Sequence, residues 1–500
     1  MPTLVSISAD RVLVGEDADA AGESTLVRSV KTALMNAAEQ VAVTDKQGVR
    51  HKVAVDELIC HVLTDVRERA ERAGADTGGR VRLGCPAIWE AGPRRRLARL
   101  ASESGLQASA SDMLDEPIAA GVSWVWNSFV HGDGYPEGRV LVFDFGGGTL
   151  DVAVLDVERG AAPRITALAA SGNSYAGDRI DKAIARRVWS QVDRSGAFRG
   201  DDVFEALLGR AAVRLKETLS GETEASTLVG GGYDDLSPLR LDAKVLAEIM
   251  QEPLEAARRA VERTLKLAGL RARNAETATL RATSFDKLTP QVDFVLAVGG
   301  MSRSRDVTAA LRTWFPDAKV VKDPGVLAPE ESVVSGLTVD DVVSELNLDR
   351  PAFSFVVEYH DRRTGELLDS ETVYEAFSPM YEQHHLVNLA FDLRYSVELR
   401  PPRDRDVVAI LSCVTLAGEK LDLRVDDRVL PGAPVYIGSR GGRFTLYVDG
   451  RITLVGQERL EMVVDEWPVI RSESRSSLRV RAKNQWVDQI EQFNWWVGGE

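Results

Sequence analysis

The stretch that decides the fold is VLVFDFGGGTLDVAVLDV, residues 140–157. Two runs of apolar and β-branched residues flank three consecutive glycines, which is typical of two strands joined by a tight turn. A turn that needs only positive φ uses one or two glycines. Three in a row also leave no Cβ between the backbone and a ligand. The pattern therefore predicts a nest of successive N–H groups that can hold an anion, at Gly146, Gly147 and Gly148.

Polar residues at the same turn point to a phosphate with a cation. Thr149 adds a hydroxyl donor beside the glycines. Asp144 and Asp151 would repel a phosphate unless a cation stood between them, so they imply Mg²⁺, held through water. On its own, the motif leaves phosphate binding and a plain turn about equally open.

A second strand ends in glycines further along the chain. The buried strand VDFVLAVGG, residues 292–300, leads directly into the helix SRDVTAALRTWF, residues 304–315. Glycines at a helix N-terminus attract a phosphate or let a flat nucleoside approach the backbone. The segment is neither a Walker motif nor a dinucleotide fingerprint. Two such elements, separated by a helical insert, predict a nucleotide held between two lobes.

Composition limits the class of protein. A chain of 500 residues exceeds a single core, so we expect two or three domains. The net charge of −15 argues against a nucleic-acid partner. The three cysteines are far apart in apolar surroundings, which favours thiols in a reducing compartment. There is no secretory signal and no apolar run of about 20 residues, so we expect a cytoplasmic protein without a membrane partner.

Strand and helix patterns divide the chain. Alternating strands and helices up to about residue 345 predict an α/β domain, with mainly helical sequence over 201–269. Beyond residue 348 the texture changes to short strands separated by turns. We therefore expect an all-β, sandwich-like domain at 350–470, followed by a tail at 471–500.

Six segments, in the right order, resemble the seventy-kilodalton heat-shock chaperones (the DnaK-like family) of the actin-fold ATPase superfamily. They are RVLVGEDADAAGESTLVRSVKTALM, GCPAIWEAGPRRRLARLASESGL, DEPIAAGVSW, FDFGGGTLDV, RLKETLSGETEAS and VDFVLAVGGMSRSRDVTAAL. The resemblance covers residues 1–345. It implies a two-lobed ATPase domain with ribonuclease-H-like sheets and a helical sub-lobe at about 178–285.

The resemblance also implies a site for ATP or ADP with Mg²⁺. Lys31 matches the lysine that orients the attacking water, and Glu116 matches a glutamate near the metal. These two form the implied catalytic set together with Asp144 and Thr149, while Asp144 and Asp151 are the implied metal residues. The implied nucleotide-binding residues are Gly146, Gly147, Gly148, Thr149, Gly177, Lys216, Ser220, Gly299, Gly300, Ser302 and Arg303.

Other positions match less directly. Val213 stands where the family's nucleoside-binding helix has a glutamate, and Met301 replaces a more usual serine. Pro86 and Arg94 match relay residues that couple the nucleotide to the partner domain. Several of the matched residues have a plainer alternative. Pro86 could simply end a strand, and Lys31 and Arg94 could be solvated helix charges. Glu116 could be a helix N-terminal acid stabilised by the macrodipole.

The sequence departs from the family in two ways. The first phosphate hairpin is absent, so LVSIS (4–8) should dock directly onto VRLGC (81–85). Either the true start lies upstream, or the protein binds nucleotide and hydrolyses it very poorly. The second departure is that the acidic interdomain linker and the long helical lid are missing too.

We therefore expect a nucleotide switch acting on a protein or peptide partner through the β-domain, with possible nucleotide-exchange or co-chaperone partners. The alternatives are a non-hydrolysing scaffold and a filament-forming actin relative.

Overall fold

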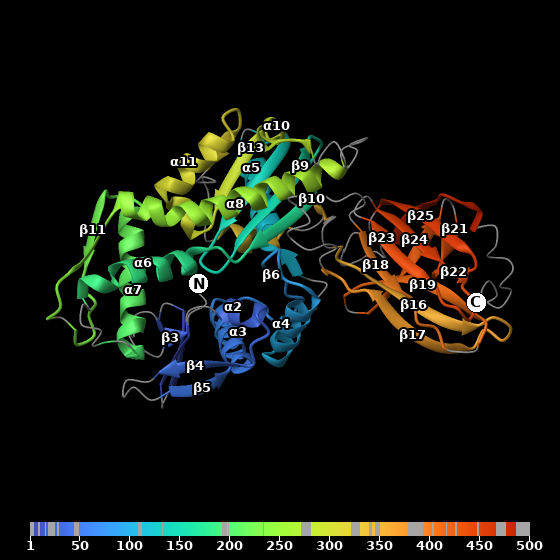
Figure 1. The fold of residues 1–500 in the computed structure, drawn as a ribbon, viewed down its shortest axis with the longest axis horizontal. Helices are drawn as coiled ribbons and strands as arrows, with labels where there is room; N and C mark the ends of the chain where they lie inside the picture. Colours follow the sequence, from blue (N-terminus) through green and yellow to red (C-terminus); the bar gives the residue numbers. More distant parts are fainter. Residues whose placement is uncertain are drawn as a thin grey trace.

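The computed structural model describes most of the chain. It covers residues 5–8, 11–15, 17–18, 26–27, 30–44, 50–108, 113–132, 134–192, 198, 200–233, 235–271, 282–321, 331–339, 343–345, 351–378, 394–402, 405–416, 418–425, 428–447, 450–466 and 477–486. A mixed α/β part is followed by a β-rich part that begins at about residue 351 (Figure 1).

The glycine-tipped segment is a hairpin at the centre of a six-stranded sheet. Strands β8 (Gly138–Phe145) and β9 (Leu150–Glu158) pair antiparallel, with Asp144 opposite Asp151. The sheet order is β14-β13-β8-β9-β10-β15. Neighbours in the sheet are β10 (Arg164–Asn173), β13 (Phe294–Val298), β14 (Lys319–Val321) and β15 (Val343–Glu345). Helix α11 (Arg305–Trp314) connects the parallel strands β13 and β14.

The hairpin strands are apolar on both faces because helices cover both. Val140 and Val142 share a hydrophobic cluster with Ile118 of helix α5 (Glu116–His131). Leu141 and Phe143 belong to a second cluster, with residues of helix α8 (Ala243–Arg271). Successive side chains of a strand point to opposite faces, so an unbroken apolar run fits a doubly covered sheet.

The expected helical insert is present between β10 and β13. It contains α6 (Gly177–Val192), α7 (Asp202–Leu219) and the two-stranded sheet of β11 (Glu224–Thr227) and β12 (Leu239–Asp242). Helix α8 then runs back from this insert across the six-stranded sheet to α10 (Phe285–Leu288) (Figure 1).

The N-terminal part forms small sheets and helices. Its elements are β1 (Val5–Ser8), β2 (Arg11–Val14), β3 (Leu26–Val27), α2 (Val30–Met35), β4 (Gln40–Thr44), β5 (Arg50–Ala54), α3 (Val55–Arg72), β6 (Leu83–Cys85), α4 (Ala91–Glu103) and β7 (Met113–Asp115). None of the described helices, here or elsewhere, is long and apolar enough to span a membrane.

The prediction that LVSIS docks onto VRLGC is wrong. Within the described residues β1 pairs antiparallel with β2 and β3, whereas β6 pairs in parallel with β7. Only two residues separate β1 from β2. The loop-closure entropy of this local hairpin is therefore far smaller than that of pairing with a strand some 75 residues away.

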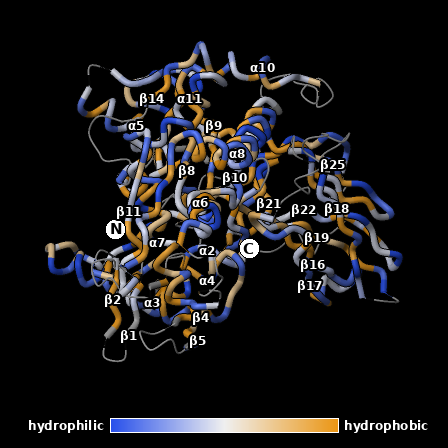
Figure 2. The backbone as a smooth tube through the Cα atoms, turned by 60° about the vertical axis from the view of Figure 1, so that its left-hand side comes forward, coloured by the Kyte–Doolittle hydropathy of each residue, from blue (hydrophilic) through white to orange (hydrophobic). Residues whose placement is uncertain are grey.

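The β-rich part is one continuous, strongly curved sheet. Its strands are β16 (Ser354–Asp361), β17 (Leu367–Tyr374), β18 (Arg394–Glu398), β19 (Val407–Val414), β20 (Lys420–Val425), β21 (Arg428–Leu430), β22 (Ala433–Tyr436), β23 (Arg443–Tyr447), β24 (Arg451–Val455), β25 (Arg459–Glu466) and β26 (Ser477–Ala482). The main path is β17-β16-β19-β20-β26-β25-β24-β23-β18. Figure 2 shows hydrophobic and hydrophilic residues alternating along these strands.

Curvature brings the two end strands of that path together, so the sheet is nearly closed. The rings of Tyr374 in β17 and Tyr395 in β18 lie 5.2 Å apart. Inside the curve, Phe355 of β16 meets Phe444 of β23 at 5.7 Å. A sheet that closes on itself buries one face of every strand.

The sheet extends beyond residue 470, the boundary that the sequence predicts. Strand β26 pairs in parallel with β20 and antiparallel with β25. Residues 477–482 are thus an interior strand rather than part of a tail. The predicted tail residues 487–500 lie outside the described part of the chain.

Candidate functional site

The backbone conformation of the hairpin tip does not require its three glycines. None of them has φ in the left-handed region. A Cβ on Gly147 would make only an ordinary contact, 3.5 Å from Oδ1 of Asp178, and one on Gly146 would lie 3.3 Å from the Thr149 carbonyl oxygen. On Gly148 it would lie 3.0 Å from the rotatable hydroxyl of Thr32. Conformation therefore explains none of the three glycines, and packing is tight at Gly146 and Gly148 but not at Gly147.

Two buried carboxyl groups lie directly behind this tip. Asp144 is 9% exposed and Asp151 is 1% exposed. Burial and the nearby charge of Glu116 raise the pKa of Asp144 to about 7, and the same two causes raise the pKa of Asp151 well above its ordinary value. Asp151 is held in place by the backbone N–H of Ala87, which donates to its Oδ1 at 2.8 Å.

A lysine and a glutamate complete the cluster. Nζ of Lys31, on α2, lies 2.5 Å from Oε1 of Glu116, the first residue of α5. Burial lowers the pKa of Lys31, but the pairing with Glu116 and the charges of Asp144 and Asp151 outweigh it, and the net shift is upward. Lys31 is thus the counter-ion of Glu116, although 43% of its side chain remains exposed to solvent.

The cluster holds more carboxyl groups than ammonium groups, and this set of carboxyl oxygens fits a cation. Three carboxyl groups face one ammonium group. Among the described residues, no group of three or more His, Cys, Asp or Glu side chains could by itself hold a metal ion. Asp144 and Asp151 would therefore hold Mg²⁺ through its water shell. Bound there, the metal would neutralise phosphate charge beside the glycine tip.

The two glycines that follow β13 differ from each other. Gly299 has φ +78°, and a Cβ there would lie 2.5 Å from Oδ1 of Asp144 and 2.6 Å from the carbonyl oxygen of Phe145. The fold itself therefore demands this glycine. Gly300 has ordinary φ, and its Cβ would meet no atom within 4 Å. The space beside Gly300 is open, as the approach of a flat ligand requires.

The remaining residues of this turn have mixed roles. Ser302 is buried, and its hydroxyl donates to the carbonyl oxygen of Gly299 at 2.7 Å. Arg303 is exposed at the end of the short helix η3 (Gly300–Arg303). Of these two side chains, only that of Arg303 therefore projects into solvent.

The helical insert also reaches the hairpin tip. The N–H of Gly177 donates to the carbonyl oxygen of Gly146 at 3.1 Å, and a Cβ on Gly177 would lie 3.4 Å from Nζ of Lys216. Lys216 pairs with Asp181 at 2.7 Å. Sequence reasoning missed Asp181, although its place on α6, one turn beyond Gly177, was readable. The hydroxyl of Ser220, one turn beyond Lys216, donates to the Lys216 carbonyl oxygen at 3.3 Å.

A cavity of about 1080 Å³ opens from the tip between α2, α6 and α7. Its wall includes Thr32, Gly148, Asp178, Trp189 and Val213. Within the described residues, the wall does not include the turn after β13. The cavity therefore joins the hairpin tip to the helical insert.

Comparison with known protein families identifies the family of this sequence. The family model described as Hsp70 protein matches residues 6–355. The chain belongs to the Hsp70 family.

Curated relatives agree with the family match. The chain is 27% identical over 375 residues to a chaperone protein DnaK of Mycoplasmoides gallisepticum, covering 71% of this chain and 58% of that protein. It is 29% identical over 282 residues to an HscA homolog of Pseudomonas paraeruginosa, covering 52% and 43%, respectively. It is 26% identical over 303 residues to a heat shock protein of Pyricularia oryzae, covering 58% and 44%. The chain thus spans about half the length of these relatives.

In this Hsp70-family chain, the two predicted relay residues lie behind the acidic cluster. Pro86 follows β6 and begins a turn, in which the N–H of Trp89 donates to the Pro86 carbonyl oxygen at 3.0 Å. The next residue, Ala87, donates its N–H to Asp151. Arg94 is fully buried and donates to Asp115 at 2.5 Å. The alternative that Arg94 is a solvated helix charge is therefore wrong.

Contacts of α4 join the Hsp70-family part to the β-rich part. The guanidinium of Arg94 lies over the ring of Phe377, and the neighbouring Arg95 pairs with Glu375. Sequence reasoning missed Phe377 and Glu375, because no local pattern shows which part of the distant strand region meets α4.

Proposed function

We propose that this Hsp70-family chain binds ATP or ADP with Mg²⁺ at the hairpin tip, beside Lys31 of α2 and Glu116 of α5. The observation that carries the proposal is the glycine tip. Its three glycines have no conformational role and Gly147 has no packing role, yet they lie beside buried carboxyl groups of raised pKa. Backbone N–H groups without Cβ atoms, next to carboxyl groups that a cation would ionise, suit a phosphate that arrives with a divalent cation.

The proposal gives each residue of the cluster a role. The N–H of Gly146 donates to the Thr149 carbonyl oxygen within the turn, so the N–H groups of Gly147 and Gly148 and the Thr149 hydroxyl would hold phosphate oxygens. Asp144 and Asp151 would bind the water shell of the metal. Lys31 would leave Glu116 for the phosphate or the attacking water, and Glu116 would then accept a proton or a water hydrogen. Preorganised donors of this kind dominate phosphoryl transfer.

The nucleotide would act on a partner through α4. Asp115, which holds Arg94, directly precedes Glu116, so the site and the contact with the β-rich part share one chain segment. We propose that the β-rich part binds a protein or peptide, that nucleotide state alters this binding, and that exchange factors or co-chaperones act on the cycle. We further propose a cytoplasmic location.

Titration calorimetry tests the nucleotide proposal. The full chain should bind ATP in the presence of Mg²⁺ and should bind more weakly when EDTA replaces the metal. Asp144→Asn should lose the metal dependence, whereas Arg303→Gln, at the exposed end of the turn, should keep it. No heat and no thermal stabilisation at millimolar Mg-ATP would disprove the proposal.

A second candidate is a scaffold that binds nucleotide without hydrolysing it. Two residues of the helical insert support a degenerate nucleotide site of this kind, because Lys216 is paired with Asp181 and the Val213 side chain offers no hydrogen bond. Phosphate release separates the two candidates. Turnover that Lys31→Ala abolishes supports the switch, while tight binding without turnover supports the scaffold.

A further inference from the structure

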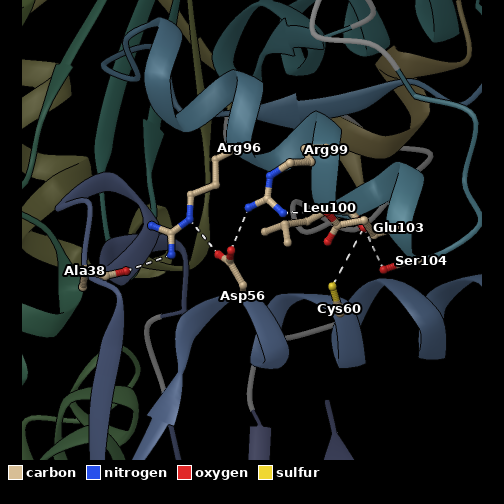
Figure 3. Close-up of polar contacts among 8 residues, drawn as sticks. All are labelled: Ala38, Asp56, Cys60, Arg96, Arg99, Leu100, Glu103 and Ser104. Atoms are coloured by element: carbon tan, nitrogen blue, oxygen red, sulfur yellow. Dashed lines mark hydrogen bonds and ion pairs between the residues drawn. The ribbon is translucent and has the colours of Figure 1, made fainter.

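Helix α4 is clamped to α3 by one shared carboxylate. Asp56 accepts from Nε of Arg96 at 2.6 Å and from a terminal nitrogen of Arg99 at 2.7 Å (Figure 3). The two arginines lie three residues apart on α4, so both reach the same acid. These hydrogen bonds hold the pKa of Asp56 below its ordinary value, although burial opposes the shift. The clamp is therefore ionised at neutral pH.

Arg96 makes one contact that Arg99 does not. Its second nitrogen donates to the carbonyl oxygen of Ala38 at 2.9 Å (Figure 3). Ala38 follows α2, the helix that carries Lys31 and lines the cavity with Thr32. A single guanidinium thus bridges α3 and the end of the helix that carries the site lysine.

The segment that Arg96 holds is tightly closed. Ala37 adopts φ 52°, a left-handed conformation that usually requires glycine. The N–H groups of Ala37 and Ala38 donate back to the carbonyl oxygens of Leu34 and Ala33, at 3.1 and 3.0 Å. The end of α2 is therefore bonded both to its own last turn and to α4, so a displacement of α2 is passed on rather than absorbed.

The same turn of α4 holds the β-rich part. Arg94 and Arg95, the two residues before Arg96, contact Phe377 and Glu375. Consecutive residues of a helix move together because its backbone hydrogen bonds fix their geometry. The contact with α2 and the contact with the β-rich part thus lie within three successive residues.

We propose that Arg96 is a positioning residue that transmits movement of α2 to the β-rich part through α4. The inference rests on the proposed nucleotide site, because it requires Lys31 to exchange Glu116 for a phosphate. It adds a second route to the one through Asp115 and Arg94, and this route begins at the opposite end of α2 from the acidic cluster.

Hydrogen exchange of the full chain, with and without Mg-ATP, tests the inference. In the wild type, nucleotide should change the exchange rate of residues 373–378 at least fivefold. In Arg96→Gln that change should fall below twofold, while the Kd of Mg-ATP stays within threefold of the wild-type value. Arg99→Gln is the matched control, because it loses Asp56 and Glu103 but no contact with Ala38. Its response should remain that of the wild type.

A nucleotide-free measurement covers the remaining outcomes. Coupling between two sites is reciprocal, so Phe377→Ala should speed exchange at residues 36–40 at least threefold in the wild-type background and leave it unchanged in Arg96→Gln. An equal effect in both backgrounds, or none in either, overturns the inference even if nucleotide binding holds. A full nucleotide response in Arg96→Gln overturns it as well. Absence of Mg-ATP binding in the wild type removes the proposed function, and the inference falls with it.

Discussion

The guanidinium of Arg94 lies 3.5 Å from the centroid of the Phe377 ring, and these two residues belong to different parts of the molecule. Arg94 is fully buried on α4, and Phe377 follows β17 with φ 61°, a left-handed conformation unusual for a bulky side chain. The Phe377 N–H donates to the carbonyl oxygen of Pro351 at 2.8 Å, which holds this conformation. The strained residue thus lies where the Hsp70-family part meets the β-rich part.

Replacing Arg94 should destabilise the protein strongly. Arg94→Met leaves the fully buried carboxylate of Asp115 without its cation, and breaking a buried pair in this way costs about 3–5 kcal/mol. Arg95→Met removes only the exposed pair with Glu375, so its cost should lie within about 1 kcal/mol. Urea unfolding followed by circular dichroism measures both. Equal losses would contradict the assignment of Arg94 as the buried member.

Alanine at two glycines should separate ligand binding from folding. Gly147→Ala places a methyl group at ordinary contact distance, so the free energy of unfolding should change by about 1 kcal/mol or less. Its affinity for Mg-ATP should fall at least tenfold, because the methyl group would add bulk to the proposed anion nest. Gly299→Ala has φ +78° and a clash with Asp144, so it should destabilise the fold itself. Calorimetry and thermal unfolding together check the contrast, and unchanged affinity in Gly147→Ala would refute the anion nest.

The raised pKa of Asp144 predicts an unusual pH dependence. With a folded pKa of about 7 and an ordinary value of 3.8, the native state keeps a proton that the unfolded state has lost over this interval. The metal-free protein should therefore lose stability as pH rises from about 4 to 7. Metal binding requires the ionised form, so Mg-ATP affinity should fall by about tenfold for each pH unit below 7.

The control for this titration is Asp144→Asn, which should weaken the pH dependence of both profiles and leave only the part due to Asp151. Calorimetry at pH 6 in two buffers of different ionisation enthalpy should also detect release of a proton on metal binding. Affinity that is independent of pH between 5.5 and 7.5 would argue against Asp144 as a metal residue.

Removing the lysine should make the metal-free protein depend on divalent cations. Lys31→Met leaves Glu116, Asp144 and Asp151 without the ammonium group among them. We expect a loss of about 1–3 kcal/mol, the usual cost of leaving a buried polar group without its partner. Millimolar Mg²⁺ should restore more of the melting temperature in this variant than in the wild type. A larger Mg²⁺ effect in the wild type would count against the cluster.

Much of the candidate site could be predicted, because its signals are local. The run of β-branched residues around three glycines predicts the hairpin, and the antiparallel register alone places Asp144 opposite Asp151. The partners supplied by distant segments could not be predicted this way. Asp181 on Lys216 and Phe377 on Arg94 depend on how helices and sheets dock, which no local pattern records.

The sheets show the same division. Strand-rich texture after residue 348 correctly predicts a β-rich part, but the sequence near residue 477 gives no sign that it pairs with β20, some 55 residues earlier. The prediction for β1 was wrong in the opposite way. Resemblance to the family suggested that β1 pairs with a distant strand, whereas it pairs with β2, the next strand in the chain.

The position of β26 has a consequence for how the protein is made. A ribosome delivers the chain from its N-terminus, so β20 and β25 emerge before the strand that joins them. Until residues 477–482 have cleared the exit tunnel, two unpaired edges are exposed on the nascent chain, and such edges readily pair with other strands. The β-rich part therefore cannot close before this strand arrives. Until then this protein, although it belongs to a chaperone family, can itself misassemble during synthesis.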